Sequence, residues 1–415
     1  MSHSNARDAP ERFRAPVSLP SKFPGCIAFS AIPEVAIPEA AIDRPARSGP
    51  SQTQGRLGAI LSCMGNRTQP VSGQAPAELE ILRQLRHRAA AAPHTRVRLG
   101  IGDDCALLAP RPGEELAVTT DLSIEGRHFR LDWHPPESVG HRTLARGLSD
   151  LAAMGAVPAA AFLSLALPPE LTRPGRAARS WLDRFLDGFF ALAHAHRVPL
   201  AGGDLAQSPV AVADIVLTGV VPRSRALLRS AARAGDRVCV TGSLGGAAAE
   251  LAALAAHPRR FRRLTAATGS HPHLYPQPRL AQGRRLLRLA SAALDISDGL
   301  STELAHLASA SGVSIEIDAS AIPLAPCATL DQALHGGEDY ELLFTVPAET
   351  RPPRQLAGVP VTVIGQVLLP HALSKSRPRA LPRSPARRDS APSVTLLHNA
   401  QRHPLTPRGW EHFRP

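Results

Sequence analysis

Aspartates recur beside glycines, or at the ends of predicted strands and helices, along this 415-residue sequence. They lie in the segments GIGDD, TTD, LSD, AGGD and DISDG, as Asp103, Asp104, Asp121, Asp150, Asp204, Asp295 and Asp298. Carboxylate oxygens suit Mg²⁺, which usually takes one or two carboxylates together with water and phosphate oxygens. The neighbouring glycines let backbone N–H groups approach a phosphate closely. The repetition predicts an Mg²⁺-dependent enzyme that acts on nucleotides or phosphates.

The alternative interpretation is structural, because aspartate also caps helices and favours turns. Any one of these residues taken singly is more often a cap than a metal ligand. Their number, and the glycines beside them, favour the metal interpretation. A further segment, GSLGGAAAE, runs into a predicted helix and is able to present N–H groups to an anion. These patterns do not identify the substrate.

Two common phosphate-handling classes are excluded. The sequence contains no GxxxxGK[ST], and its only lysines, Lys22 and Lys375, are not in a glycine-rich loop, which excludes a P-loop NTPase. It contains no HRD and DFG pair, which excludes a protein kinase. A nucleotide must therefore be held by another scaffold.

Strands and helices alternate in the part of the chain that must position the aspartates. Apolar spacing predicts helices over residues 78–91, 137–158 and 179–196, and strands over 115–126, 160–168, 198–205 and 210–221. Strand, glycine turn and helix follow over 236–254, and strand, acidic turn and helix over 289–312, with strands predicted within 313–323 and 335–347. The pattern predicts an α/β architecture with one domain over 76–225 and a second over 226–415.

Composition bounds the remaining expectations. With 44% hydrophobic residues the chain has enough apolar surface for a sizeable core. Residues 1–75 are rich in Pro, Ser, Ala and Gly and are expected to be largely disordered, whereas 370–392 is expected to be a low-complexity basic insert. That insert is either a solvated linker or a segment that binds anions. Aromatic residues make up only 4%, which disfavours base stacking on RNA.

The cysteines and the hydropathy pattern bear on location. The five cysteines are widely spaced and form no CxxC, which argues against a disulfide framework or a zinc site. There is no run of 18 apolar residues and no secretory signal pattern at the N-terminus. The chain is therefore expected to be cytoplasmic, with no membrane and no nucleic-acid partner.

An ordered set of segments makes the chain resemble the thiamine-monophosphate kinases. The set is GIGDDCALL, TTDLSIEGRHF, LSDLAAMGAVP, AGGD, VTGSLGGAAAEL, LDISDGLSTELAHL, GGEDYELLFT, IGQV and GWEHF. The resemblance covers roughly residues 76–369 and 393–415. It implies an α/β (α+β) two-domain fold of the aminoimidazole-ribonucleotide-synthetase type, in which the N-terminal domain forms a β-barrel-like interface in a homodimer. It also implies transfer of the ATP γ-phosphate to thiamine monophosphate, assisted by several Mg²⁺ ions.

The resemblance also implies roles for single residues, carried over motif by motif. No general base is implied; Asp121, Asp150 and Asp204 would assist transfer through Mg²⁺. The metal ligands would be Asp104, Thr119, Thr120, Asp121, Asp150, Asp204, Asp295 and Asp298. Nucleotide contacts would come from Gly203, Asp204, Arg229 and Ser297. Substrate contacts would come from His128, Glu338 and Trp410.

Simpler roles remain open for some of these residues. His128 fits an ordinary surface or core histidine, Ser297 fits a helix cap, and Trp410 fits a core aromatic residue. One departure from the family pattern is GGDLAQ at residues 202–207, where the family commonly has GGDTTR.

The first alternative is another ATP-using enzyme of the same fold. Selenophosphate synthetase would need a reactive Cys or selenocysteine motif, the hydrogenase-maturation relative would end in Cys, and aminoimidazole-ribonucleotide synthetase matches GWEHF less well. A non-catalytic nucleotide- or RNA-binding protein with a basic insert is the alternative outside the enzymes.

Overall fold

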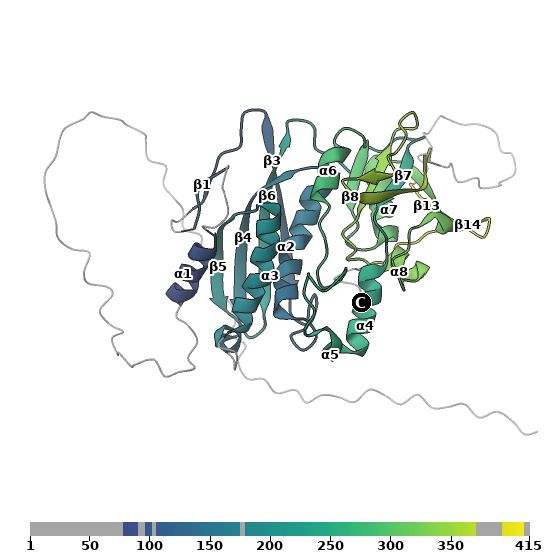
Figure 1. Ribbon diagram of the computed structural model, residues 1–415. Coiled ribbons are helices and arrows are strands. Elements are labelled where there is room, and N and C mark those ends of the chain that lie inside the picture. Colours follow the sequence, from purple (N-terminus) through teal and green to yellow (C-terminus); the bar gives the residue numbers. More distant parts are fainter. Residues whose placement is uncertain (1–77, 90–95, 102–104, 175–178, 371–391, 411–415) are drawn as a thin grey trace, which may run out of the picture. The chain divides into compact units, whose positions relative to one another are not determined.

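The structure is a computed structural model that describes residues 78–89, 96–101, 105–174, 179–370 and 392–410 (Figure 1). The expectations for residues 1–75, for Asp103 and Asp104, and for nearly all of the insert 370–392 lie outside the described residues.

A four-stranded sheet is built from the first part of the described chain. Its strands are β3 (Glu114–Ile124), β4 (Val157–Leu167), β5 (Leu200–Gln207) and β6 (Val212–Pro222). Their order is β3-β6-β4-β5, with β4 and β5 parallel and the other neighbours antiparallel. A short hairpin of β1 (Val97–Leu99) and β2 (Leu107–Leu108) and the helix α1 (Glu78–Ala89) accompany this sheet.

Two long helices cover one face of this sheet. They are α2 (Pro136–Ala153) and α3 (Trp181–His196), which pack on each other and on the strands (Figure 1). Proline at the first position of α2 fits a helix start, since the first N–H groups have no partner within the helix. A capping box between Ser180 and Asp183 begins α3, and Arg197 in the left-handed conformation ends it.

The opposite face of the sheet is not covered by these helices. Along β3, buried and half-buried side chains alternate with the exposed side chains of Leu116, Val118 and Leu122, which are 47%, 62% and 45% exposed. The strand order runs from edge to edge without closing, so within this chain the sheet is open rather than a barrel. The β-barrel-like interface expected from the resemblance would need a second subunit.

A second sheet follows, with strands β7 (Arg237–Thr241), β8 (Ala292–Asp295), β9 (Ser314–Asp318), β10 (Leu342–Val346), β12 (Val359–Leu368), β13 (Val394–His398) and β14 (Gln401–Pro404). The order is β14-β13-β9-β12-β7-β10-β8, and β11 (Gln355–Leu356) pairs with β12. The helices of this part are α4 (Gly246–Ala256), α5 (Pro258–Phe261), α6 (Leu280–Leu286), α7 (Leu300–Ser311) and α8 (Leu330–His335). Short 3₁₀ turns are η1 (Pro169–Thr172) and η2 (Ala319–Ala321). The mixed α/β, two-part fold expected from the sequence is therefore present.

Helix α2 connects the two parts. It contacts β3, β6 and α3 on one side and α6 and β8 on the other. One apolar core runs from the α2–α3 layer to residues of β7 and β10, and a second lies around β8, α7 and β9. The functional side chains of α2 are therefore held between two packed layers.

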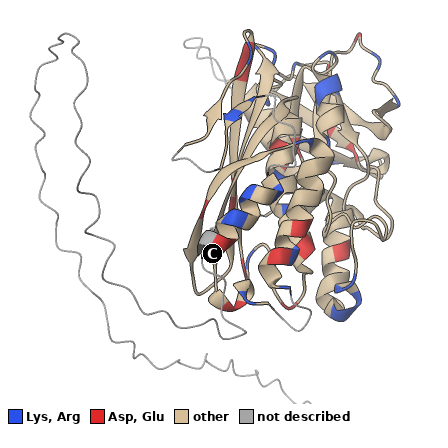
Figure 2. Ribbon diagram, turned by 60° about the vertical axis from the view of Figure 1, so that its left-hand side comes forward, with Lys and Arg blue, Asp and Glu red and all other residues tan. Residues whose placement is uncertain are grey.

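Charge and hydropathy follow the same layers. Blue and red positions are interspersed along the helices in Figure 2, so basic and acidic residues share the same elements. None of the helices in the described part of the chain combines the length and apolar character that crossing a bilayer requires.

Candidate active site

A polar stripe runs along one side of the otherwise buried helix α2. Arg142, Arg146 and Asp150 are spaced four residues apart, which places them on one helix face, one above the other. The side chain of Arg142 is only 5% exposed and that of Arg146 only 16%. Such groups are buried in a core only when they are paired, so the stripe marks a polar site between the two parts of the fold.

A pocket of about 530 Å³ opens along this stripe. Eight of the residues expected at the site from the sequence line it: Asp121, His128, Asp150, Asp295, Ser297, Asp298, Glu338 and Trp410. Other lining residues include Arg127, Arg130, Trp133, His134, Arg146, His273 and Tyr340. Segments more than 280 residues apart in the sequence thus meet in one cavity, since both Asp121 and Trp410 border it.

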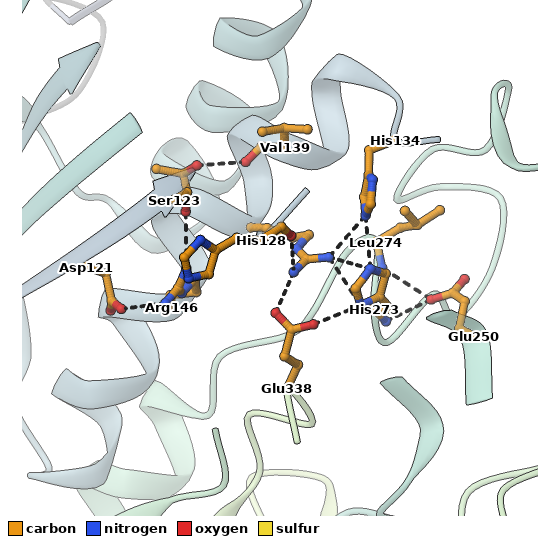
Figure 3. A network of polar contacts seen from close by, with 12 residues as sticks. Asp121, Ser123, His128, His134, Val139, Arg146, Glu250, His273, Leu274 and Glu338 are labelled. Carbon is orange, nitrogen blue, oxygen red and sulfur yellow. Dashed lines mark hydrogen bonds and ion pairs between the residues drawn. The ribbon is translucent and has the colours of Figure 1, made fainter. Parts of the chain in front are cut away.

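Asp121 lies within β3, facing α2. Its carboxylate is 3.0 Å from the Arg146 guanidinium, which also donates to Leu122 O and Ser123 Oγ (Figure 3). Burial raises the pKa of Asp121 to about 6; the Arg146 charge opposes this rise and the nearby Asp150 carboxylate adds to it. A carboxyl group whose pKa lies this near to neutral pH is easily protonated and easily ionised. It is therefore well suited to exchange a proton for a cation.

Asp150 and Asp295 form the rest of the acidic group. Thr119 Oγ1 donates to Asp150, and Ser149 Oγ donates to Asp295 at 2.7 Å. Burial raises the pKa of both carboxyls, for Asp295 with a further contribution from the charge of Asp150. Like charges crowded in a buried place are stabilised by an added cation, which is the electrostatic character of a cation site.

Glu303 of α7 is a fourth carboxylate beside this group. It is buried, accepts hydrogen bonds from Ser297 Oγ at 3.4 Å and from Asp298 N at 3.3 Å, and raises the pKa of both Asp150 and Asp295. The sequence analysis did not identify it. It therefore holds the DISDG turn while adding negative charge next to the pocket.

The loop GGEDYE is joined to the DISDG turn by backbone hydrogen bonds. Glu338 N donates to Ser297 O at 2.7 Å, and Tyr340 N donates to Ile296 O at 3.0 Å. Gly337 has a φ of 71° and lies so close to the turn that a Cβ would stand 2.6 Å from Ser297 O. Only glycine fits there, so the two motifs are built to pack against each other.

The C-terminal segment also packs on the DISDG turn. Trp410 N donates to Asp298 O at 3.3 Å, and its half-exposed side chain borders the pocket. A Cβ on Gly409 would lie 1.7 Å from Asp298 O, so glycine is required where the two backbones cross. Trp410 is thus a pocket residue and not the buried core aromatic residue considered as its alternative.

Two other substrate residues expected from the sequence are held by hydrogen bonds. His128 Nδ1 accepts from Ile124 N at 3.0 Å, which leaves the proton on Nε2. Glu338 pairs with Arg142. It also pairs with His273, as Figure 3 shows. Burial alone would raise the pKa of Glu338, but the Arg142 charge and the His273 hydrogen bond hold it well below its ordinary value.

Four residues expected at the site lie elsewhere in this chain. Gly203 and Asp204 are on β5, at the sheet edge opposite β3, and line a separate cavity of about 820 Å³. Thr120 is exposed because neighbouring strand residues point to opposite faces, so it faces away from Thr119 and Asp121. Arg229 is exposed and does not border the pocket, although its charge lowers the pKa of Asp150. Asp104 lies outside the described residues.

Most of the aspartates lie inside the predicted elements. Asp121 and Asp204 lie inside strands and Asp150 inside α2, within the ranges predicted from the sequence, whereas Asp295 and Asp298 lie at a strand end and turn. Ser297 does not cap α7, whose N-cap is Gly299 with no side-chain cap.

Backbone N–H groups of the glycine-rich segment before α4 are bonded to the side chain of Asp339. The Asp339 carboxylate accepts from Gly245 N at 2.7 Å and from Ala247 N at 3.1 Å. The N–H groups of Gly245 and Ala247 in GSLGGAAAE are therefore bonded to a side chain of the same protein.

The chemistry of the acidic group fits a hard cation. The four aspartates Asp121, Asp150, Asp295 and Asp298 border one pocket, and hydroxyl groups of Thr119 and Ser149 bond to two of them. No three His, Cys, Asp or Glu side chains within the described ranges converge tightly enough to hold a metal by themselves. Mg²⁺ commonly takes only one or two carboxylates and fills its remaining positions with phosphate oxygens and water, so the arrangement is compatible with a metal that arrives with a nucleotide.

Comparison with protein families matches both parts of the fold. Residues 102–221 match the family AIR synthase related protein, N-terminal domain, and residues 233–369 match AIR synthase related protein, C-terminal domain. Among characterised relatives, the chain is 41% identical over 287 residues to a thiamine-monophosphate kinase of Salmonella typhimurium, covering 65% of this chain and 84% of the relative. It is 36% identical over 287 residues to that of Bacillus subtilis, covering 66% and 86%.

Solved structures agree. The thiamine-monophosphate kinase of Stenotrophomonas maltophilia K279a superposes with a TM-score of 0.59 at 36% identity, covering 72% of this chain and 96% of that chain. AaThiL complexed with AMPPCP and TMP superposes with a TM-score of 0.58 at 29% identity, covering 74% and 89%. The hydrogenase maturation protein HypE, at 18% identity and a TM-score of 0.59, shares the fold alone. By the extent and identity of these matches, the chain belongs to the thiamine-monophosphate kinase family of AIR synthase related proteins.

Proposed function

We propose that this chain is a thiamine-phosphate kinase that transfers the γ-phosphate of ATP to thiamine monophosphate, forming thiamine diphosphate with the help of Mg²⁺. The observation that carries the proposal is that one pocket is bordered both by the carboxylates Asp121, Asp150 and Asp295 and by the acceptor-side residues Glu338 and Trp410. Relatives at 36–41% identity are thiamine-monophosphate kinases, and AaThiL is complexed with AMPPCP and TMP.

The acidic group would hold the metal ions. Asp121, Asp150 and Asp295 are the ligands proposed within this pocket, with Asp298 at its border. Bound Mg²⁺ would neutralise the charge of the phosphates during transfer. Thr119 and Ser149 orient two of the carboxylates, and Arg146 prevents their mutual repulsion from distorting the site.

The acceptor needs orientation more than activation. A phosphate oxygen of thiamine monophosphate is anionic near neutral pH, so no general base is proposed. Glu338 provides a negative charge and Trp410 an aromatic face, and both suit the cationic thiazolium ring of the acceptor. Catalysis then consists mainly of placing the two phosphates in line and shielding their charge.

The open sheet face supports a homodimer. Exposed Leu116, Val118 and Leu122 form an apolar strip on β3, and such a strip on a soluble protein usually marks an interaction surface. Asp204 lies on the same sheet, at its far edge, so we propose that the roles of Gly203 and Asp204 in nucleotide binding depend on the assembled dimer. Residues 76–225 would then form the nucleotide and dimerisation domain and 226–415 the second domain.

A direct assay tests the proposal. Purified full-length chain is incubated with ATP, Mg²⁺ and thiamine monophosphate, and thiamine diphosphate is quantified by chromatography after oxidation to its fluorescent thiochrome. We expect product that depends on all three components. Thiamine in place of its monophosphate should give none, because the acceptor phosphate is missing. A pure, folded chain that forms no thiamine diphosphate would refute the proposed function.

A further inference from the structure

The Glu338 carboxylate is held from two distant parts of the chain. Arg142 Nη2, on α2, donates to its Oε1. His273 Nδ1 lies 3.1 Å from Glu338 Oε2, and Figure 3 shows His273 next to Glu338. The side chains of Arg142 and His273 are 5% and 2% exposed, whereas that of Glu338 is 28% exposed. Two buried side chains therefore hold the Glu338 carboxylate on its protein side, while the exposed part of Glu338 borders the pocket.

The partners of His273 fix which of its nitrogens carries the proton. A carboxylate only accepts hydrogen bonds, so the Nδ1 that lies next to Glu338 Oε2 carries the proton. Nε2 is then the acceptor, and it faces the Arg142 guanidinium, which only donates, and His134 Nε2 at 3.0 Å. His134 Nδ1 in turn lies 3.1 Å from Arg130 N and 3.2 Å from Arg130 O. Burial, with the nearby Arg142 charge, lowers the pKa of both histidines, which keeps this neutral donor chain intact.

The backbone of His273 is anchored independently. Glu250 Oε2, from α4, accepts from His273 N at 2.7 Å and from Leu274 N at 3.2 Å, and its Oε1 pairs with His271 at 2.8 Å. His273 is thus fixed by α4 and His134 by the segment before α2. The Glu338 carboxylate is therefore positioned by Arg142 of α2 and by His273, whose backbone is held by Glu250 of α4.

That loop needs such support. Glu338 and Tyr340 have φ values of 59° and 49°, which are unfavourable for residues with a side chain. Arg142 additionally donates to His128 O at 3.2 Å, so one guanidinium joins two residues that border the pocket on the acceptor side. The Arg142 guanidinium can therefore influence acceptor binding through His128 and Glu338 without contacting the acceptor itself.

We propose that Arg142, His134 and His273 are positioning residues that hold Glu338 as an ionised partner for the organic-cation part of the phosphate acceptor. The inference rests on the proposed function. It assigns acceptor recognition to a buried Arg–His–His network, separately from the acidic group that serves the nucleotide phosphates.

The test compares the KM for thiamine monophosphate with the KM for ATP in variants of His273. His273→Leu removes the donor to Glu338 at similar volume, and we expect the KM for thiamine monophosphate to rise about tenfold or more while the KM for ATP changes less than about twofold. His273→Asn places an amide donor near the former Nδ1 and should restore most of the loss. In a Glu338→Gln background, His273→Leu should add less than about twofold, because its effect passes through Glu338.

His141 supplies a matched control. It is a buried histidine next to Arg142 on α2, and its Nε2 bonds to Pro276 O at 2.8 Å, but it has no contact with Glu338. His141→Leu should lower the melting temperature without moving the ratio of the two KM values. If His273→Leu does not fold, His134→Leu asks the same question one hydrogen bond further from the pocket, with the same selective rise expected.

The outcomes separate the two proposals. An active wild-type enzyme in which His273→Leu and His134→Leu leave the KM ratio unchanged, or in which His273→Leu and Glu338→Gln are additive, overturns the positioning role alone. A wild-type chain that neither binds thiamine monophosphate in calorimetry nor phosphorylates it overturns the proposed function together with this inference.

Discussion

Single side chains set the charge balance of the pocket. The Arg146 guanidinium pairs with Asp121 and also lowers the pKa of Asp150, so one cation stabilises two carboxylates that face the same cavity. It does not cancel their charge, and Asp295 and Glu303 add more. The pocket therefore keeps an excess of negative charge at the end bordered by these carboxylates, and this excess is what a divalent cation would relieve.

Asp121→Asn is the simplest test of that excess. The amide keeps the shape of the carboxylate but removes its charge, so activity should fall by about 10²-fold or more, as when other charge-stabilising groups are lost from an active site. The measurement is kcat/KM for both substrates at saturating Mg²⁺. Asp187→Asn, on the exposed side of α3, is the control and should have normal activity. Near-normal turnover of Asp121→Asn would remove this residue from the metal site.

The dependence of Mg²⁺ requirement on pH follows from the raised pKa of Asp121. Its carboxyl is protonated below about pH 6 and ionised above it. Protons therefore compete with Mg²⁺ at low pH, and the Mg²⁺ concentration for half-maximal rate should rise up to about tenfold for each pH unit below 6. Rates measured against Mg²⁺ from pH 5 to 8 test this. A flat Mg²⁺ requirement across that range would show that Asp121 does not exchange its proton for the metal.

Whole elements meet where two backbones cross. The C-terminal segment lies on the DISDG turn only because Gly409 has no Cβ, and the GGEDYE loop lies there only because of Gly337. Both segments pack against the same DISDG turn, so this turn supports two of the segments that border the pocket. A side chain added at either glycine would move a wall and leave the sheet beneath it in place.

Gly409→Ala tests this support. A Cβ at this position would stand 1.7 Å from Asp298 O and 2.5 Å from Thr302 Oγ1, so the segment must lift and carry Trp410 with it. We expect the KM for thiamine monophosphate to rise about as much as in Trp410→Ala, with an unchanged melting temperature. Gly100→Ala is the control, since a Cβ there has no neighbour closer than 3.8 Å. Unaltered kinetics in Gly409→Ala would mean that the segment does not contribute to binding.

At the scale of the whole molecule, the uncovered face of the first sheet predicts association. Val118, 62% exposed, lies in the middle of the apolar strip on β3. Val118→Glu would bury a charge in the proposed interface, at a cost of several kcal/mol, and should convert the dimer to a monomer. Light scattering after gel filtration measures the mass. Leu369→Glu, at an exposed leucine beyond the end of β12, should leave the mass unchanged, and a wild-type monomer would contradict the dimer.

Local patterns predicted the elements better than the site. Helix α3 was predictable from apolar spacing and a serine start, and β4 from its apolar run. Arg142 and Glu338 are 196 residues apart in the sequence, and no local pattern indicates that they pair. The one signal available was the spacing of Arg142, Arg146 and Asp150, which places three charged groups on a single helix face.

The glycine-flanked aspartates show a second limit. Gly203 has a φ of 146°, and a Cβ there would be 1.9 Å from Leu163 O, so close strand packing by itself requires this glycine. The sequence alone does not distinguish that requirement from a phosphate contact. Asp204 is consequently placed with the other aspartates by motif but lies across the sheet from them in the folded chain.

Helix α2 fixes the distance between two charged side chains of the pocket region. With 1.5 Å per residue, its charged face spans about 12 Å from Arg142, which pairs with Glu338, to Asp150, which we propose to hold Mg²⁺. Because Arg142 and Asp150 belong to one continuous, buried helix, the distance between them cannot adjust to a longer or shorter substrate. A related enzyme that used another vitamin phosphate would need new side chains at other positions along this helix, since no single substitution changes the helical rise.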